Sequence, residues 1–413
     1  MNRRIFLKRM ISTGIYLGAG LGMPGLARAA GNGRVLVVVF LRGGWDGLNV
    51  VVPYGEDAYH SLRPTIRIRQ PSAGDAESAL DLDGFFGLHP AMAAIHTLYQ
   101  QGRVAVLPAV HYAGATRSHF EGQDILEDAS TTPTTSGWLA RYLSATASGG
   151  ASQRALSLTP GVPRSLRGPL PVAAYPDLGN LALASARKDQ DMLGALMASE
   201  YARPASTANP SAETLHNTAI QLLADIEELQ TVNNMPLEGG AVYPSTTFGR
   251  QLRQAAALVK AKPDLELITL NLGGWDTHRA EGAGQQSGQM ALLLKQFSDS
   301  VGAFYQDLGA SGNRVTLLAG SEFGRTAAEN GSAGTDHGHA TTWLVIGGGV
   351  RGGMYNGAGW PGLGPEQLQE GRYLAHSIDF RDVYSECLSR GLGLSNPGMV
   401  IPGYNLSGIG FMA

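Results

Sequence analysis

Short, nearly continuous apolar runs recur along the chain and mark its predicted strands. A run that is apolar at every position, without alternation, is typical of a strand that is buried on both faces of a parallel sheet. We therefore predict strands at residues 35–41, 104–110, 265–272, 314–319 and 342–346.

Between these runs, apolar residues recur at steps of three and four, which predicts helices. The predicted helices cover residues 90–100, 121–128, 137–145, 212–230, 248–260, 290–308 and 381–390. Strands that alternate with helices predict an α/β fold, with a doubly wound, mostly parallel sheet and helices on both faces. The charged, turn-rich stretch 61–84 is predicted to be a surface loop.

Residues 1–29 have the pattern of an export signal. Arg-Arg-Ile-Phe-Leu-Lys at 3–8 precedes a mildly apolar stretch, and Ala-Arg-Ala at 27–29 offers a small-residue cleavage site. The paired arginines favour a twin-arginine (Tat) signal over an ordinary Sec signal. We expect cleavage after Ala29, one mature domain of residues 30–413, and a periplasmic or extracellular location, with the twin-arginine translocase as export partner.

Composition excludes several classes of protein. The formal net charge of −3 argues against nucleic-acid binding, which needs a basic surface. No run has the apolar length of a transmembrane helix, so we expect no stable membrane insertion. Cys387 is the single cysteine of the chain, so no intramolecular disulfide forms, and its helical context predicts a buried, inert thiol.

The tetrapeptide Gly-Gly-Trp-Asp occurs twice, at 43–46 and 273–276, each time after a predicted strand. Ligand sites of open α/β sheets lie outside the carboxyl ends of the strands. Asp46 and Asp276 are therefore candidate metal ligands, and His278 lies two residues beyond the second. The alternative is that both aspartates only cap turns.

Thr-Asp-His-Gly-His at 335–339 is the densest group of ligand-type side chains in the chain. Neutral imidazoles with carboxylates suit zinc, and carboxylate-containing sites also accept manganese. We predict that Asp336, His337 and His339 bind metal; the alternative is a polar loop.

The segment 321–326 lies between the predicted strand 314–319 and the group at 335–339. Glu322 is placed to be a metal ligand or to support one. Arg325 is placed to bind an oxyanion in bidentate fashion. A local ion pair between the two residues is an equal alternative.

Residues 116–120 follow the second strand and begin a helix. Ser118 with Glu121 three residues later fits a capping box, which explains the serine without catalysis. A hydroxyl at a helix N-terminus beside a metal is equally a candidate nucleophile. Arg117 and His119 are candidates for orienting a substrate.

Together these motifs resemble the domain-of-unknown-function family 1501, which is grouped with the alkaline-phosphatase-like superfamily. The resemblance covers essentially the whole mature chain. It implies an alkaline-phosphatase-like, doubly wound α/β fold with two divalent metals at the carboxyl edge of the sheet. It also implies metal binding by Asp46, by Asp276 with His278 and by Asp336 with His337, and a nucleophilic role for Ser118. His376 is the one late histidine that can complete the metal shell, and the absence of Cys-x-Pro-x-Arg excludes the aldehyde-forming type of sulfatase.

We therefore expect an exported, metal-dependent hydrolase of small phosphate or sulfate esters. The predicted ligands of one or two ions, zinc or manganese, are Asp46, Asp276, His278, Glu322, Asp336, His337 and His339. The predicted catalytic residues are Ser118 as nucleophile, Arg117 or Arg325 to hold the anionic oxygens, and His119 to orient the substrate. The alternatives are a non-catalytic secreted binding or structural protein, and a metal-dependent isomerase or transferase of phospho-sugars.

Overall fold

The computed structural model describes residues 16–17, 33–130, 134–147, 154–180, 228–285 and 287–413. The strands of its main sheet are β1 (Tyr16–Leu17), β2 (Val35–Arg42), β6 (Val104–His111), β7 (Ala155–Ser157), β8 (Ala173–Ala174), β9 (Leu267–Gly273), β10 (Val315–Gly320), β11 (Thr341–Gly347), β12 (Gly353–Met354) and β13 (Ile378–Asp379). A small second sheet contains β3 (Val51–Val52), β4 (Leu80–Asp81) and β5 (Gly87–Leu88).

The main sheet has the order β1-β8-β7-β9-β2-β10-β11-β6-β12, with β13 also paired to β6. β8, β7, β9, β2 and β10 are parallel to one another. β11 runs antiparallel to both of its neighbours, β10 and β6, so β6 has the same direction as β10. The predicted mostly parallel sheet is confirmed, with β11 as an internal exception.

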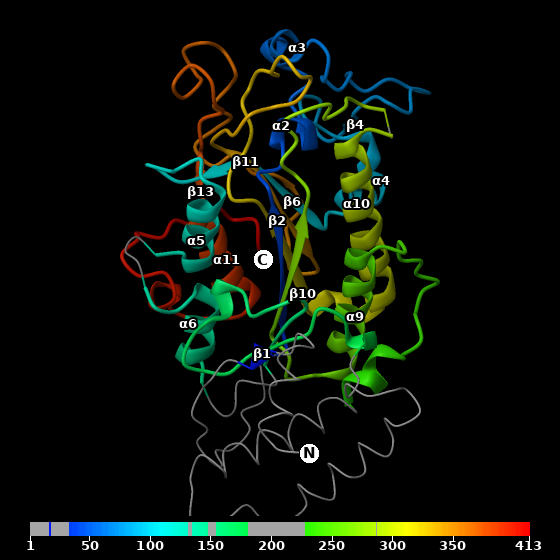
Figure 1. Cartoon of the computed structure of the whole chain (residues 1–413), viewed down its shortest axis with the longest axis vertical. Coiled ribbons are helices and arrows are strands. Elements are labelled where there is room, and N and C mark those ends of the chain that lie inside the picture. The colour runs from blue at the N-terminus through cyan, green and yellow to red at the C-terminus, as the bar shows by residue number, and fades with distance from the viewer. Residues whose placement is uncertain (1–15, 18–32, 131–133, 148–153, 181–227, 286) are drawn as a thin grey trace, which may run out of the picture.

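Helices cover both faces of the sheet (Figure 1). α4 (Ala93–Gln100), α9 (Thr247–Ala261) and α10 (Gln289–Leu308) pack on one face. α5 (His119–Asp128), α6 (Trp138–Ala145) and α11 (Phe380–Glu386) pack on the other. This is the predicted doubly wound arrangement.

β2 shows why its sequence is apolar at every position. Val37 and Val39 lie in the core beneath α4, α9 and α10, whereas Leu36 and Val38 lie in the core beneath α5, α6 and α11. Successive side chains of a strand point to opposite faces, so a strand with a core on each side has no polar positions.

The carboxyl ends of β2, β9, β10 and β6 lie at one edge of the sheet, at the top of Figure 1. α2 (Gly47–Val50) directly follows the first Gly-Gly-Trp-Asp turn there, and α3 (Asp57–Leu62) with the small sheet lies beyond it. The loops that carry the predicted chemistry gather at this edge, as the carboxyl-edge rule predicts.

Some predictions fall outside the described residues. The export signal 1–29 lies outside them except for β1, and the helix 212–230 except for its last turn. The division into a cleaved signal and one domain stays a prediction. Among the described helices, none has both the length and the apolar character that a membrane span requires. Cys387 is buried, as predicted, and burial raises the pKa of its thiol.

The prediction of a surface loop at 61–84 is wrong for its first part. Ile66 and Ile68 are buried, and so is the whole side chain of Arg63. A charged side chain stays in a protein interior when its charge is paired and its donors are satisfied. Arg63 meets both conditions through Asp46, and the pair shapes the site described next.

Candidate metal centre

The two Gly-Gly-Trp-Asp turns lie in contact at the carboxyl edge. Gly43 and Gly274 have positive φ angles of 122° and 98°, which favour glycine. A Cβ on Gly43 would lie 2.9 Å from the backbone nitrogen of Asp276, so only glycine allows the turns to approach this closely. The indole rings of Trp45 and Trp275 pack edge to face beneath them, with centroids 5.5 Å apart.

The aspartates at the ends of these turns have different surroundings. Asp46 is 1% exposed, and both of its carboxylate oxygens accept hydrogen bonds from the guanidinium of Arg63. The remaining Arg63 donors are taken by Asn49 and by backbone carbonyls. The structure therefore places Asp46 in a buried ion pair and does not bring it to the other predicted ligands.

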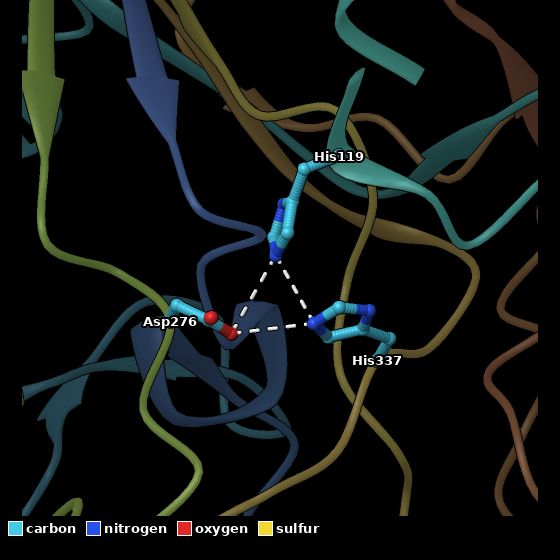
Figure 2. A group of neighbouring side chains, drawn as sticks. All are labelled: His119, Asp276 and His337. Carbon is cyan, nitrogen blue, oxygen red and sulfur yellow. Dashed lines mark hydrogen bonds and ion pairs between the residues drawn. The ribbon is translucent and has the colours of Figure 1, made fainter. Parts of the chain in front are cut away.

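Asp276 lies with two histidines in a compact group (Figure 2). The Nε2 atoms of His119, from the first turn of α5, and His337, from the loop before β11, are 3.0 Å apart. Asp276 Oδ1 lies 3.6 Å from His119 Nε2 and 3.3 Å from His337 Nε2. Figure 2 shows the three side chains pointing toward one another from three separate segments.

His278 extends the group. Its Nε2 lies 3.0 Å from Asp276 Oδ1 and 3.2 Å from His337 Nε2. Two predicted metal ligands, His278 and His337, therefore meet Asp276 at one point. His119, a predicted substrate-orienting residue, contacts Asp276 and His337 from the other side.

Hydrogen bonds on the far side of each ring determine where its proton lies. Nδ1 of His119 lies 2.7 Å from a carboxylate oxygen of Glu322, and Nδ1 of His278 lies 3.1 Å from Asp336 Oδ1. Nδ1 of His337 lies 2.9 Å from the backbone carbonyl oxygen of Arg117. These oxygens only accept, so each ring donates from Nδ1 and, when neutral, presents an Nε2 lone pair to the centre of the group.

The carboxylates around the group are held in their charged form. Burial acts to raise the pKa of Asp276, Glu322 and Asp336, but hydrogen bonds and positive charges around them outweigh burial, and the pKa of each is lowered. Burial lowers the pKa of His337, whereas the hydrogen bond to Glu322 raises the pKa of His119.

This donor set fits a divalent cation. Nε2 lone pairs of adjacent neutral rings repel one another and cannot all be satisfied by hydrogen bonds among themselves. Two imidazoles with one carboxylate are a known zinc ligand set, and ligating histidines usually donate their other N–H to a carboxylate or carbonyl. Glu322 and Asp336, both predicted as ligands, have this supporting position here.

Arg325 is predicted to bind an oxyanion, but in the structure its side chain is buried and bonded to protein acceptors. Its guanidinium is buried and donates to the carbonyls of Gly43, Gly44, Trp275 and Thr335 and to Asp276 Oδ1. Its donors hold the two turns together. The structure therefore makes Arg325 a positioning residue.

Ser118 is the N-cap residue of α5, but its side chain makes no capping hydrogen bond. The predicted capping box is therefore wrong. Ser118 lines a cavity of about 840 Å³ that also includes Tyr112, Phe120 and Arg381. Arg117 pairs with Glu370 at 3.3 Å on the rim of the site.

His339 does not join this group. Its Nε2 lies 2.9 Å from Nδ1 of His376, and its ring packs against the ring of His111. Two metal-ligand candidates from one short motif, His337 and His339, therefore belong to two different clusters of histidines.

The profile of the family described as "Protein of unknown function (DUF1501)" matches residues 34–404. The chain belongs to the DUF1501 family. No curated protein matches its sequence.

The solved structures found to be similar to this DUF1501 protein have low sequence identity to it. The C-terminal periplasmic domain of EcEptC from Escherichia coli is 12% identical, with a TM-score of 0.36 over 94% of this chain and 92% of that one. PsFucS1 sulfatase from Pseudoalteromonas sp. is 12% identical, with a TM-score of 0.36 over 99% and 76%. The lipoteichoic acid synthase LtaP from Listeria monocytogenes is 9% identical, with a TM-score of 0.27 over 80% and 71%. Similarity this weak carries no conclusion about activity.

Sequence reasoning missed two features of the DUF1501 site. Arg63 lies in a segment without apolar periodicity, so nothing in the sequence indicated that it reaches Asp46. His119 follows Ser118 at a predicted helix start, where the sequence pattern indicates a capping or substrate-binding role and not a metal ligand. Its position one residue inside the helix, at the carboxyl edge, was the available signal.

Proposed function

We propose that the protein is a metal-dependent hydrolase of phosphate or sulfate esters. The observation that carries this proposal is the convergence of the Nε2 atoms of His119 and His337 with Asp276 Oδ1, beside which lies His278. Zinc is the preferred ion for this set, and manganese is the second choice. Such an ion supplies charge that neutralises the ester oxygens and lowers the pKa of a coordinated hydroxyl or water.

Ser118 is the proposed nucleophile. Its hydroxyl is not used in capping, it adjoins His119 in sequence, and it lines a cavity large enough for the alcohol part of an ester. The serine oxygen bonds to phosphorus or sulfur as the bond to the alcohol oxygen breaks, and the alcohol leaves with the proton that the serine gives up. Water then displaces the serine oxygen and releases phosphate or sulfate.

Arg117 is the proposed partner of the anionic substrate, in place of Arg325. The Arg117 side chain is 38% exposed and its ion partner, Glu370, is exposed as well. An exposed pair of this kind contributes little stability, so substrate oxygens can compete for the guanidinium. The buried donors of Arg325 are already taken by protein acceptors.

Hydrolysis of p-nitrophenyl phosphate and p-nitrophenyl sulfate tests the proposal. We expect turnover of at least one ester after loading with zinc or manganese, no turnover after chelation, and a loss of about a thousandfold or more in Ser118→Ala. Ser61→Ala, an exposed serine on α3, is the matched control and keeps wild-type activity. Full activity in Ser118→Ala overturns the nucleophile, and chelator-insensitive turnover overturns the metal. Metal binding without turnover of any ester favours a binding protein.

Export by the twin-arginine route is part of the proposal. It rests on the Arg-Arg-Ile-Phe-Leu-Lys sequence at 3–8. Replacing both arginines by lysine keeps the charge and is expected to leave the protein in the cytoplasmic fraction with its signal uncleaved. Unchanged export of that variant contradicts the route.

A further inference from the structure

Two loops meet at the candidate metal centre. The loop after β9 carries Asp276 and His278, and the loop between β10 and β11 carries Asp336 and His337. Figure 2 shows Asp276 and His337 pointing toward each other from these loops. Neither loop forms a helix or an extended strand at these residues. Contacts between the loops must therefore set the distance between the two pairs of side chains.

Glu281 lies in the first of these loops, and its side chain is completely buried. Its Oε2 accepts a hydrogen bond of 2.9 Å from the hydroxyl of Thr277, the residue before His278. The same Oε2 accepts a hydrogen bond of 2.8 Å from the hydroxyl of Thr335, the residue before Asp336. One carboxyl oxygen therefore joins the two loops directly beside their candidate ligands.

The surroundings of this carboxyl group make the connection rigid. Thr277 is 2% exposed and Thr335 is fully buried. The side-chain amide of Asn49 donates to the other oxygen, Oε1, over 3.4 Å. A buried carboxyl group is costly unless its oxygens are hydrogen-bonded, and hydrogen bonds in a low-dielectric interior are stronger than those exposed to water. Glu281 is thus held by side chains from three separate segments.

Backbone hydrogen bonds keep Glu281 itself in place. Its N–H donates to the carbonyl of Ala333 over 2.9 Å, and the N–H of Thr335 donates to the carbonyl of Thr277 over 3.1 Å. The N–H of Met290, in the first turn of α10, donates to the carbonyl of Glu281 over 3.2 Å. The carboxyl group therefore holds the loops from a support that is fixed to a core helix.

We propose that Glu281 is a positioning residue of the candidate metal centre, which holds the loop of Asp276 and His278 against the loop of Asp336 and His337. The inference rests on the proposed metal site. Among the described residues, Glu281 makes no hydrogen bond to Asp276 or to a histidine of the centre, so it acts through the two threonines and is not a ligand. Losing a residue that orients a ligand typically weakens metal binding by about 10–100-fold.

Zinc affinity and the spectrum of bound cobalt test the inference in the folded protein. Glu281→Ala removes the acceptor of both threonine hydroxyls. We expect zinc binding to weaken by about tenfold or more in a competition titration with a chelator. We also expect the visible spectrum of bound cobalt, which reports ligand geometry, to change. Glu281→Gln keeps an oxygen that accepts two hydrogen bonds, so it is expected to restore both the affinity and the spectrum.

Thr335→Val is the milder second variant. Valine keeps the shape of the side chain and removes only the hydroxyl that donates to Glu281. We expect zinc binding to weaken in the same direction, by less than in Glu281→Ala. If Glu281→Ala does not fold, Thr335→Val decides the question.

Glu386→Ala is the matched control. Glu386 is also a buried glutamate, but its carboxyl oxygens accept from the backbone of Ile409, Gly410 and Met412 near the end of the chain. Its loss is expected to lower stability and to leave zinc affinity and the cobalt spectrum unchanged, as a purely structural role of Glu281 would also do.

The outcomes separate this inference from the proposed function. Wild-type affinity in Glu281→Ala and Thr335→Val, or affinity that Glu281→Gln does not restore, overturns the inference. Metal bound to the wild type in the same experiment leaves the proposed function standing. A wild-type protein that binds neither zinc nor cobalt overturns both.

Discussion

Arg325 donates a 2.6 Å hydrogen bond to Asp276 from a fully buried guanidinium, while the Asp276 side chain is 47% exposed. The arginine thus holds the carboxylate from below and leaves its outer side open to His119, His278 and His337. The same guanidinium bonds to the carbonyls of Gly43 and Trp275, one from each Gly-Gly-Trp-Asp turn. One side chain therefore fixes both the position and the charge of the central carboxylate.

Replacing Arg325 by alanine is expected to destabilise the fold strongly. The change leaves a cavity beneath both turns and leaves buried carbonyls without donors, at a cost of about 1–3 kcal/mol for each unsatisfied group. Urea unfolding measures this loss. Arg69→Ala removes an exposed arginine paired with Asp75 and is the control, with little expected loss of stability. Equal losses in both variants contradict the positioning role.

The two aspartates of the repeated turn are expected to respond in opposite ways to replacement by asparagine. Asp46→Asn leaves the charge of Arg63 buried and unpaired, so it lowers the free energy of unfolding by about 3 kcal/mol or more but keeps the metal. Asp276→Asn removes a ligand charge and loses the metal. Elemental analysis and urea unfolding of both proteins separate these outcomes. Metal loss in Asp46→Asn with retention in Asp276→Asn would reverse the assignment.

Glu322 is expected to act on the metal through His119. It is fully buried and accepts hydrogen bonds from His119 Nδ1 and from Gln123, which keeps the imidazole proton on Nδ1. Glu322→Gln replaces this acceptor charge and is expected to weaken zinc binding at pH 8 by about 10–100-fold. Competition titration with a zinc chelator measures the constant. Glu370→Gln, at an exposed ion pair, keeps wild-type affinity; an unchanged affinity in Glu322→Gln contradicts the supporting role.

His89 is expected to make stability depend on pH. It is 1% exposed, its Nδ1 accepts from the backbone of Ala91, and burial lowers its pKa from 6.5 to about 4. Between pH 6.5 and about 4, the imidazole of His89 therefore binds a proton in the unfolded chain but stays neutral in the folded protein. This contribution is complete above pH 6.5 and is lost as the pH falls toward 4, by about 3 kcal/mol.

His89→Asn tests this contribution. Asparagine is a good N-cap residue and can accept from Ala91, so the variant folds without the titrating ring. The difference in unfolding free energy between wild type and variant is expected to shrink as the pH is lowered from 7 to 4.5. A difference that stays constant over that range contradicts the buried neutral histidine.

The sheet and its helices were predictable because their signals are local. The run at 35–41 is apolar throughout since β2 has a core on each face, and α10 repeats apolar residues at helical spacing. The antiparallel direction of β11 was not predictable. An apolar run buried on both faces looks the same in either direction, and the long loop that reverses the chain between β10 and β11 has no periodicity.

The location of the site was predictable from the sequence, but the residues that form it were not all predictable. The rule that ligands gather at carboxyl ends of strands placed Asp276, His278 and His337 correctly at one edge. It could not separate Asp276 from Asp46, since that difference depends on Arg63, a distant residue in an irregular segment. It also could not separate His337 from His339, because the backbone between them is an irregular loop in which Gly338 packs against Arg325.

A metal ion held by Asp276 and the histidines around it is central to the proposed function. The most direct test is zinc and manganese content of the folded, signal-free protein by inductively coupled plasma mass spectrometry, compared among wild type, Asp276→Ala and Asp46→Ala. We expect bound metal in wild type, loss of one equivalent in Asp276→Ala and no loss in folded Asp46→Ala. Equal metal content in wild type and Asp276→Ala, or none in wild type after incubation with either ion, would contradict it.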